Sequence, residues 1–195
     1  MAKKILLIRH AESESNAGLH TSDPALISLT SMGYKQAENI AVNLSEPPEL
    51  IVVSPYFRTQ QTAEPTIKRF LGVTCEEWNT HEFTYFSPEK CKNTTRDERL
   101  PIIKKYWDLC DPSYCDGPGA ESFGDFINRV KATINKIQER KEQSIVLFSH
   151  GQFIAALLWL VNNKISEVTS EKMREYYCWL QKKLLPNAGI VEVVF

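Results

Sequence analysis

Two histidines that are distant in the sequence each end a short apolar stretch. Arg9 and His10 come directly after the run 5–8, and His150 follows the stretch 145–149. Runs of this length are typical of buried strands, and the carboxyl ends of neighbouring strands in an α/β sheet border one crevice in which ligands bind. An arginine presents a planar fork of donors that matches phosphate or carboxylate oxygens. The two strand endings therefore predict an anion-binding site.

A further arginine and a glycine fit the same site. Arg58 comes four residues after Ser54, where the apolar run 50–53 ends, and it lies at the start of a predicted helix. Backbone N–H groups at a helix N-terminus favour anions. Gly151 follows His150 at the start of another predicted helix, where the lack of a side chain lets a ligand approach the backbone. Each residue alone would more simply face solvent, but together they favour one shared anion site.

The elements that must carry these residues alternate between strand and helix along the chain. Such alternation predicts an α/β fold, a three-layer α/β/α sandwich with a mostly parallel central sheet. Thr30 is the expected N-cap of the first helix. Strands are predicted over 4–8, 50–53, 73–78, 144–148 and 190–195, with an outer strand over 176–184, and helices over 34–44, 56–71, 96–109, 121–139 and 151–161.

Length and composition predict one domain with an insertion. A chain of 195 residues with 43% hydrophobic residues can bury a substantial core, so we expect a single domain over 1–195. The stretch from about 83 to 119 is rich in turn-forming residues, such as Ser87-Pro88 and Gly117-Pro118-Gly119. We expect it to cover the crevice as a small cap insertion.

The charge balance and the cysteine content indicate which binding partners and which cellular compartment to expect. The 23 basic and 24 acidic residues nearly cancel, which gives no reason to propose nucleic acid or a membrane as partner. The five cysteines are an odd number without a C-x-x-C pair, as is typical of reduced thiols in a cytoplasmic protein. The apolar run 153–161 is far shorter than the roughly 20 residues that span a bilayer. We expect a soluble, cytoplasmic protein, and the oligomeric state is not predicted.

The residues around both histidines also follow the order of a known family. The segment Leu7-Ile8-Arg9-His10-Ala11-Glu12-Ser13, with Asn16, resembles the Arg-His-Gly signature of the histidine phosphatase superfamily, the phosphoglycerate mutase-like proteins. The resemblance covers nearly the whole chain. The further segments that resemble motifs of this family, in its order, are Leu29-Thr30 with Gly33 and Gln36-Ala37, Ser54-Pro55 with Arg58-Thr59 and Gln61-Thr62-Ala63, Glu121-Ser122 leading to Arg129, and Ser149-His150-Gly151.

The resemblance implies a phosphatase that uses no metal or other cofactor. His10 would attack the phosphoryl group and form a phosphohistidine intermediate, which splits one displacement into two. Arg9, Arg58 and His150 would bind the phosphoryl oxygens and offset the negative charge of the transition state. The four histidines show no metal-ligand spacing, which argues against a metal hydrolase. The further residues expected to bind a small phosphorylated substrate are Asn16, Ser22, Tyr85 and Gly151.

Cleavage of a phosphate ester also requires a proton for the leaving oxygen, and in this family a carboxylic acid from the middle of the chain supplies it. Glu82 is the candidate, because it follows the predicted strand 73–78 and begins the insertion. Glu76 and Glu77 are competitors that we expect to face solvent. His81, beside Glu82, is expected at the surface.

Two departures from the family pattern change what is expected. Ala11 stands where the signature has glycine, and its methyl group is tolerated if the local φ is negative. The run 82–86 lacks the arginine that cofactor-dependent mutases carry directly after the glutamate, which favours a phosphatase with water as the final acceptor. The alternatives are a phosphoglycerate mutase-type transfer and a weakly active phospho-ligand binding or regulatory protein.

The insertion is expected to select the substrate. Its basic residues either bind a second phosphate or a carboxylate, or form the solvated face of a helix. Its aromatic residues either pack the insertion or line the pocket. The residues concerned are Lys90, Lys92, Arg96 and Arg99 among the basic ones, and Tyr106, Trp107 and Tyr114 among the aromatic ones.

Overall fold

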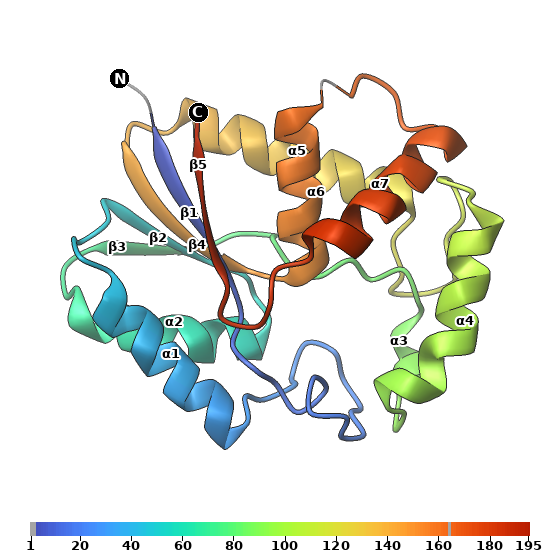
Figure 1. The fold of residues 1–195 in the computed structure, drawn as a ribbon, viewed down its shortest axis with the longest axis horizontal. Coiled ribbons are helices and arrows are strands. Elements are labelled where there is room, and N and C mark those ends of the chain that lie inside the picture. The colour runs from blue at the N-terminus through green and yellow to red at the C-terminus, as the bar shows by residue number, and fades with distance from the viewer. Residues whose placement is uncertain (1–2, 164) are drawn as a thin grey trace.

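The computed structural model describes residues 3–163 and 165–195, and its strands are β1 (Lys4–Arg9), β2 (Leu50–Val53), β3 (Thr74–Glu77), β4 (Ser144–Ser149) and β5 (Ile190–Val194). They form one five-stranded sheet in the order β3-β2-β4-β1-β5 (Figure 1). The first four strands pair in parallel, and β5 pairs antiparallel with β1 at one edge. The predicted mostly parallel sheet is therefore confirmed.

Helices cover both faces of the sheet (Figure 1). Because successive strand residues point to opposite faces, Ile8 of β1 enters one core and Leu7 enters the other. This arrangement confirms the predicted three-layer sandwich. One layer contains α1 (Ser31–Asn43) and α2 (Phe57–Arg69), and the other contains α5 (Phe123–Glu139), α6 (Gly151–Asn162) and α7 (Ser170–Lys183).

The first helix begins at Ser31, three residues before the predicted start at 34, and the predicted residue Thr30 caps it. It lies against the segment that follows β1. The Thr30 hydroxyl accepts a hydrogen bond from the Gly33 N–H at 3.0 Å, as expected of an N-cap. A Cβ atom on Gly33 would collide with the carbonyl oxygen of Glu12. Glycine at this position therefore lets α1 support the backbone just beyond His10.

The register of the sheet brings the predicted strand endings together. β1 and β4 stay in register up to the pair Arg9 and Ser149, so the next residues of the two strands are His10 and His150. The N–H of His10 donates to the Ser149 carbonyl at 2.9 Å. β2 ends on the other side of β4 and is followed by Ser54. All three endings lie at one edge of the sheet, as expected of an α/β fold.

The stretch predicted as an insertion connects β3 to α5 and carries α3 (Pro88–Cys91) and α4 (Arg96–Leu109). Helix α4 has the predicted bounds, begins with a capping box and stands apart from the sheet (Figure 1). Its Trp107 stacks on Tyr177 of α7, with ring centroids 4.5 Å apart. This contact attaches residues 83–119, hereafter the cap, to the sandwich.

The outer strand predicted over 176–184 is wrong, because this stretch belongs to α7. Met173, Tyr176 and Leu180 are buried and recur with the period of a helix face. The Thr169 hydroxyl caps the helix by accepting from the Lys172 N–H. Aromatic residues in this stretch favour a strand by themselves, but the packing of the buried face overrides that preference.

Candidate active site

His10 is buried at the end of β1 in the form that a nucleophile requires. Its Nδ1 lies 2.7 Å from the Ala11 carbonyl oxygen and donates to it, which leaves the lone pair of the ring on Nε2. Burial lowers the pKa of His10 well below its ordinary value, and the positive charges of Arg58 and Arg9 lower it further. The imidazole is therefore neutral near pH 7, with the unprotonated nitrogen fixed in position.

Ala11 fits where the family signature has glycine. It is fully buried and is not among the described residues with positive φ, so its methyl group causes no backbone strain. The methyl group packs with Leu29 and Ala37, while the Ala11 N–H donates to the Thr62 hydroxyl at 3.0 Å. The condition of a negative φ at Ala11 is therefore met, and the Ala11 carbonyl is in place to orient His10.

Arg58 joins the two histidines. Its Nε donates to Nε2 of His10 at 3.2 Å, and its Nη2 lies 3.0 Å from Nδ1 of His150. The other ring nitrogen of His150 lies 2.8 Å from the Ser54 hydroxyl. Burial, followed by the charge of Arg58, lowers the pKa of His150 well below its ordinary value. Burial also lowers the pKa of Arg58 to about 10, so this arginine stays cationic at neutral pH.

Arg9 provides the second guanidinium and fixes the role of Gly151. The Arg9 Nη1 donates to the Leu185 carbonyl at 2.5 Å, whereas its buried Nε has no acceptor among the residues described. A Cβ atom on Gly151 would lie 3.3 Å from this Nε and 2.7 Å from Cδ1 of Leu184. Gly151 is predicted to let a ligand approach the backbone, and in the structure its missing side chain leaves room for the Arg9 guanidinium.

Glu82 is the buried carboxyl beside these arginines. Its Oε1 accepts from the N–H of Gln152 at 3.0 Å, in the first turn of α6, and from the N–H of Phe83 at 3.2 Å. Burial raises the pKa of Glu82 above its ordinary value, against the opposing charges of Arg58 and Arg9. A carboxyl group with a raised pKa is suited to donate a proton.

The competing carboxylates lie elsewhere. Glu76 accepts from Trp78 and pairs with Arg140, and Glu77 accepts from Gln60 on the exposed surface beside β3. Neither lines the pocket that contains His10.

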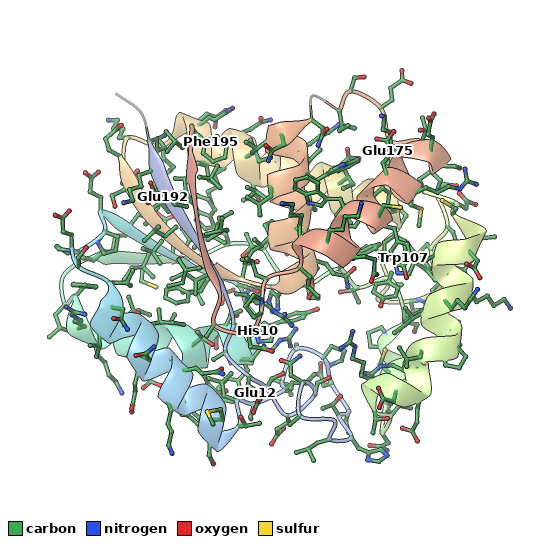
Figure 2. The ribbon with its side chains drawn as sticks, in the orientation of Figure 1. His10, Glu12, Trp107, Glu175, Glu192 and Phe195 are labelled. Atoms are coloured by element: carbon green, nitrogen blue, oxygen red, sulfur yellow. The ribbon has the colours of Figure 1, made fainter. Side chains whose placement is uncertain are left out.

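That pocket lies between the carboxyl edge of the sheet and the cap and has a volume of about 370 Å³. Figure 2 shows His10 at the ends of the strands, with α4 on the right. Both Asn16 and Tyr85 line the pocket, but Ser22 does not. The Ser22 hydroxyl instead donates to Asn93 at 2.8 Å on the exposed surface, so the geometry gives no support for a role in substrate binding.

The aromatic residues of the cap pack it more than they line the pocket. Tyr106 and Trp107 are buried around Phe83, while Tyr114 lies at the outer surface. His81 is half-buried rather than at the surface, because its ring stacks on Tyr56 with centroids 5.4 Å apart.

Asn187 is a site residue that the sequence analysis missed. Its Nδ2 lies 2.8 Å from Oδ1 of Asn16 and 3.3 Å from the carbonyl oxygens of both His10 and Ala11. Its location in the Pro186-Asn187-Ala188-Gly189 turn, directly before the last strand, was a signal for a strand-end residue at the same sheet edge. Asn187 holds the loop after β1 in place against the C-terminal turn.

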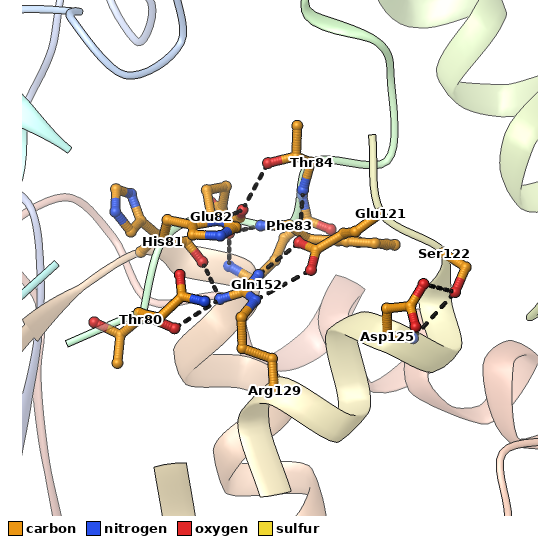
Figure 3. Close-up of polar contacts among 12 residues, drawn as sticks. Thr80, His81, Glu82, Phe83, Thr84, Glu121, Ser122, Asp125, Arg129 and Gln152 are labelled. Carbon is orange, nitrogen blue, oxygen red and sulfur yellow. Dashed lines mark hydrogen bonds and ion pairs between the residues drawn. The ribbon is translucent and has the colours of Figure 1, made fainter. Parts of the chain in front are cut away.

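A half-buried ion pair holds the loop that carries Glu82 (Figure 3). Arg129 of α5 pairs with Glu121 through two nitrogens, and its Nη1 donates to the carbonyls of Asn79 and His81. On the far side of Glu82, the Thr84 N–H donates to Glu121 at 3.1 Å. The ion pair therefore fixes the loop on both sides of the acid.

We expect Glu121→Gln to slow the cleavage of alkyl phosphates about tenfold or more, and that of nitrophenyl phosphate less than about twofold. If Glu82 protonates the leaving oxygen, its displacement slows only those esters whose leaving oxygen needs the proton, and small displacements of catalytic groups are costly. The measurement is kcat for the two kinds of ester. Glu142→Gln, at the surface ion pair with Arg140, is the matched control and should change neither rate. Equal slowing of both esters by Glu121→Gln would contradict a positioning role.

Among residues 3–163 and 165–195, no group of three or more His, Cys, Asp or Glu side chains is arranged to hold a metal ion. Within the same residues, no helix is long and apolar enough to cross a membrane.

A neutral buried histidine, two arginines and a carboxyl with a raised pKa at the edge of a parallel sheet define a site for phosphoryl transfer. The chain belongs to the histidine phosphatase superfamily (branch 1), whose family model matches residues 5–180. The sequence-based recognition of this family is thereby confirmed.

Named relatives extend this comparison. "Putative phosphoserine phosphatase 2" of Hydrogenobacter thermophilus is 26% identical over 198 residues, which cover 98% of this chain and 89% of the relative. "Phosphoglycerate mutase-like protein AT74" of Arabidopsis thaliana is 29% identical over 180 residues, 77% of this chain, and the match spans only 55% of that relative. A solved phosphoserine phosphatase from Entamoeba histolytica, in complex with 3-phosphoglyceric acid, has the same fold with a TM-score of 0.71, at 23% identity over 97% of this chain and 89% of that one.

Proposed function

We propose that this protein is a metal-independent phosphatase that hydrolyses small phosphomonoesters through a phosphohistidine on His10. The observation that carries the proposal is the fixed tautomer of His10, in which Nδ1 donates to Ala11 and Nε2 keeps its lone pair next to Arg58. The two relatives named as phosphoserine phosphatases support hydrolysis of this substrate class.

The reaction has two displacements. In the first, Nε2 of His10 attacks phosphorus, the bond from phosphorus to the ester oxygen breaks, and the Glu82 carboxyl gives its proton to the leaving oxygen. In the second, the Glu82 carboxylate takes a proton from water, the water oxygen bonds to phosphorus, and the phosphorus–nitrogen bond breaks. Inorganic phosphate leaves, and both His10 and Glu82 return to their starting forms.

The surrounding cations stabilise the charge on the phosphoryl oxygens. In the structure, the Arg58 Nε–H donates to Nε2 of His10, the nitrogen that must attack. When a phosphoryl group binds, one of its oxygens accepts this N–H in place of Nε2, and the lone pair of Nε2 becomes free to attack phosphorus. The buried Nε of Arg9 gains the acceptor that it lacks among the described residues. His150 and Asn16 complete the set of donors to the phosphoryl group.

The pH dependence of kcat/KM for an alkyl phosphate follows from the lowered pKa of His10 and the raised pKa of Glu82. His10 must be neutral, and because its pKa is lowered, activity persists below pH 6.5 and falls only as the pH drops through that lowered pKa. Glu82 must be protonated, so activity falls as the pH rises through its raised pKa. Profiles of the native protein and Glu82→Gln on the same substrate should differ by the loss of this alkaline limb. An identical alkaline limb in both would contradict the assignment.

Phe83 favours hydrolysis over a mutase reaction. It occupies the position at which the mutases have an arginine, and its ring is buried and stacked on Phe126 with centroids 4.3 Å apart. A side chain packed in this way holds no second acidic group. A test is to follow substrate loss and release of inorganic phosphate together, with and without a chelator. We expect the amount of inorganic phosphate released to equal the amount of substrate lost, both with and without the chelator. Isomerisation of the substrate without release of phosphate would identify a mutase.

We also propose the cytoplasm as the compartment, since the cysteines of the described residues are all free thiols.

A further inference from the structure

Tyr56 lies between the residues that bind the phosphoryl group and the loop that carries the acid, and it has no part in the two displacements above. It is half-buried at the N-cap of α2, between the end of β2 and Arg58. An N-cap is normally Ser, Thr, Asp or Asn, whose side chain accepts a backbone N–H, but the Tyr56 side chain makes no such bond. A departure from a local preference of this kind is expected where the side chain has a role in function.

The Tyr56 ring contacts the phosphoryl-binding residues. Cζ of Arg58 lies over the ring, 5.0 Å from its centroid, and the His150 ring meets the Tyr56 ring edge-on with centroids 5.1 Å apart. The attraction between the ring and the cation adds to the hydrogen bonds that the guanidinium forms through its three nitrogens. Tyr56 therefore limits how far Arg58 and His150 can shift. The partners in those hydrogen bonds are His10, the Pro24 carbonyl and His150.

The other contacts of Tyr56 are with the loop of the acid. Its phenol oxygen lies 3.2 Å from the Thr84 hydroxyl, which itself donates to the Glu82 carbonyl at 3.2 Å (Figure 3). Because the single proton of the Thr84 hydroxyl is used in that bond, the Tyr56 hydroxyl is the donor to Thr84. The Tyr56 ring also stacks on His81, the residue before Glu82. Tyr56 thus contacts the loop on both sides of the acid.

We propose that Tyr56 is a positioning residue, which sets the distance between the phosphoryl-binding pair, Arg58 and His150, and the acid Glu82. This inference rests on the proposed phosphatase function. The attacking and leaving atoms lie on opposite sides of phosphorus, so the phosphoryl group must be held while Glu82 reaches the side opposite His10. Separate segments of the chain carry these groups, and a misplacement of about 1 Å can cost about 100-fold in rate.

Tyr56→Phe tests the hydroxyl, because it keeps the ring contacts and removes only the bond to Thr84. We expect kcat for alkyl phosphates to fall about fivefold or more and kcat for nitrophenyl phosphate to change less than about twofold. The Kd of inorganic phosphate, measured by calorimetry, should stay within about twofold of the native value. Equal slowing of both esters, or slowing of neither, would overturn an effect of the hydroxyl on the acid.

A double substitution tests whether the hydroxyl acts through Glu82. In Glu82→Gln the acidic proton is already absent, so adding Tyr56→Phe should slow the alkyl ester by less than about a further twofold. If the two substitutions instead multiply their separate effects on kcat, Tyr56 does not act through Glu82.

Tyr56→Leu tests the ring. Arg58 and His150 lose the aromatic contact, so the Kd of inorganic phosphate should rise about fivefold or more, and kcat should fall for both esters. A native Kd in folded Tyr56→Leu would overturn this part of the proposal. If circular dichroism shows that Tyr56→Leu is unfolded, Tyr56→Met, an unbranched side chain without an aromatic face, takes its place.

Tyr34→Phe is the matched control. The Tyr34 hydroxyl also bonds to a side chain of α2, since it accepts from Gln61, but Tyr34 does not line the pocket that contains His10. Its rates and its Kd for phosphate should equal those of the native protein.

The phosphate measurement separates this proposal from the phosphatase function, because it needs no turnover. If the native protein cleaves neither ester, the proposed function fails, and the Kd of Tyr56→Leu still decides the contact with the phosphoryl-binding pair. If the native protein cleaves both esters and the Tyr56 variants match it in rate and Kd, the positioning role is overturned while the proposed function stands.

Discussion

His10→Ala is expected to reduce phosphatase activity on the order of 10⁴-fold or more, because no other described side chain is in place to attack phosphorus. His150 is the neighbouring imidazole, with the two ring centroids 5.2 Å apart. Its Nδ1 accepts from Arg58 and its Nε2 is hydrogen-bonded to the Ser54 hydroxyl, so it has no lone pair free for attack. The measurement is kcat for nitrophenyl phosphate, whose good leaving group makes the nucleophile the main requirement.

The fold should survive this substitution, and inorganic phosphate should still bind, because Arg9 and Arg58 remain in the site. Thermal unfolding followed by circular dichroism and calorimetry with phosphate check the two points. The control is His20→Ala, since His20 is an exposed histidine whose only described ion pair is with Glu98, and it should keep full activity. Activity of His10→Ala within tenfold of that of the native protein would show that another group is the nucleophile.

Glu82→Gln is expected to slow the cleavage of alkyl phosphates about 10²- to 10⁴-fold and that of nitrophenyl phosphate far less. The amide keeps the shape of the side chain and an oxygen that accepts from the Gln152 and Phe83 N–H groups, so the loop should stay in place. The amide has no acidic proton to donate to the oxygen of a poor leaving group. The measurement is the slope of kcat against the pKa of the leaving group.

Two outcomes bear directly on this assignment. A slope that is steeper in Glu82→Gln than in the native protein supports Glu82 as the acid, whereas parallel slopes would remove it from that role. Glu77→Gln provides the matched control, because Glu77 accepts only an exposed hydrogen bond from Gln60 among the contacts described and should leave the slope unchanged.

The sequence predicts the sheet, and with it the convergence of the site, because buried parallel strands have a strong local signal. Continuous apolar runs end at His10, at Ser54 and at His150, and a parallel sheet must bring such ends to one edge. The family motifs then distinguish residues that the fold alone leaves equivalent, such as the two histidines.

The features that the sequence does not predict depend on contacts between distant segments. Tyr176 and its neighbours have strand propensity, and only the core formed with α6 makes them helical. Asn187 acts through the carbonyls of His10 and Ala11, which are more than 170 positions away. The bond from Arg58 to the attacking nitrogen is likewise visible only once β1 and α2 are placed together.

The sequence also does not predict which side chains of a loop or of the cap face the pocket, as Ser22 and the cap arginines show. Ser22 was expected to bind substrate, but its loop turns its hydroxyl to Asn93 at the surface. Arg96 and Arg99 were as compatible with a solvated helix as with an anion site, and the structure places both at the wall of the catalytic pocket. Side-chain chemistry alone decides neither case, because loop and cap geometry select which side chains face the substrate.

The most direct test of the central claim is to trap the covalent intermediate. The protein is mixed with a phosphate ester labelled in its phosphoryl group, stopped within one turnover in alkaline detergent, and digested for peptide analysis. We predict label on the peptide that contains His10, stable in base and lost in acid, and absent from His10→Ala. Rapid hydrolysis without any label on His10, or label on another residue, would contradict the account.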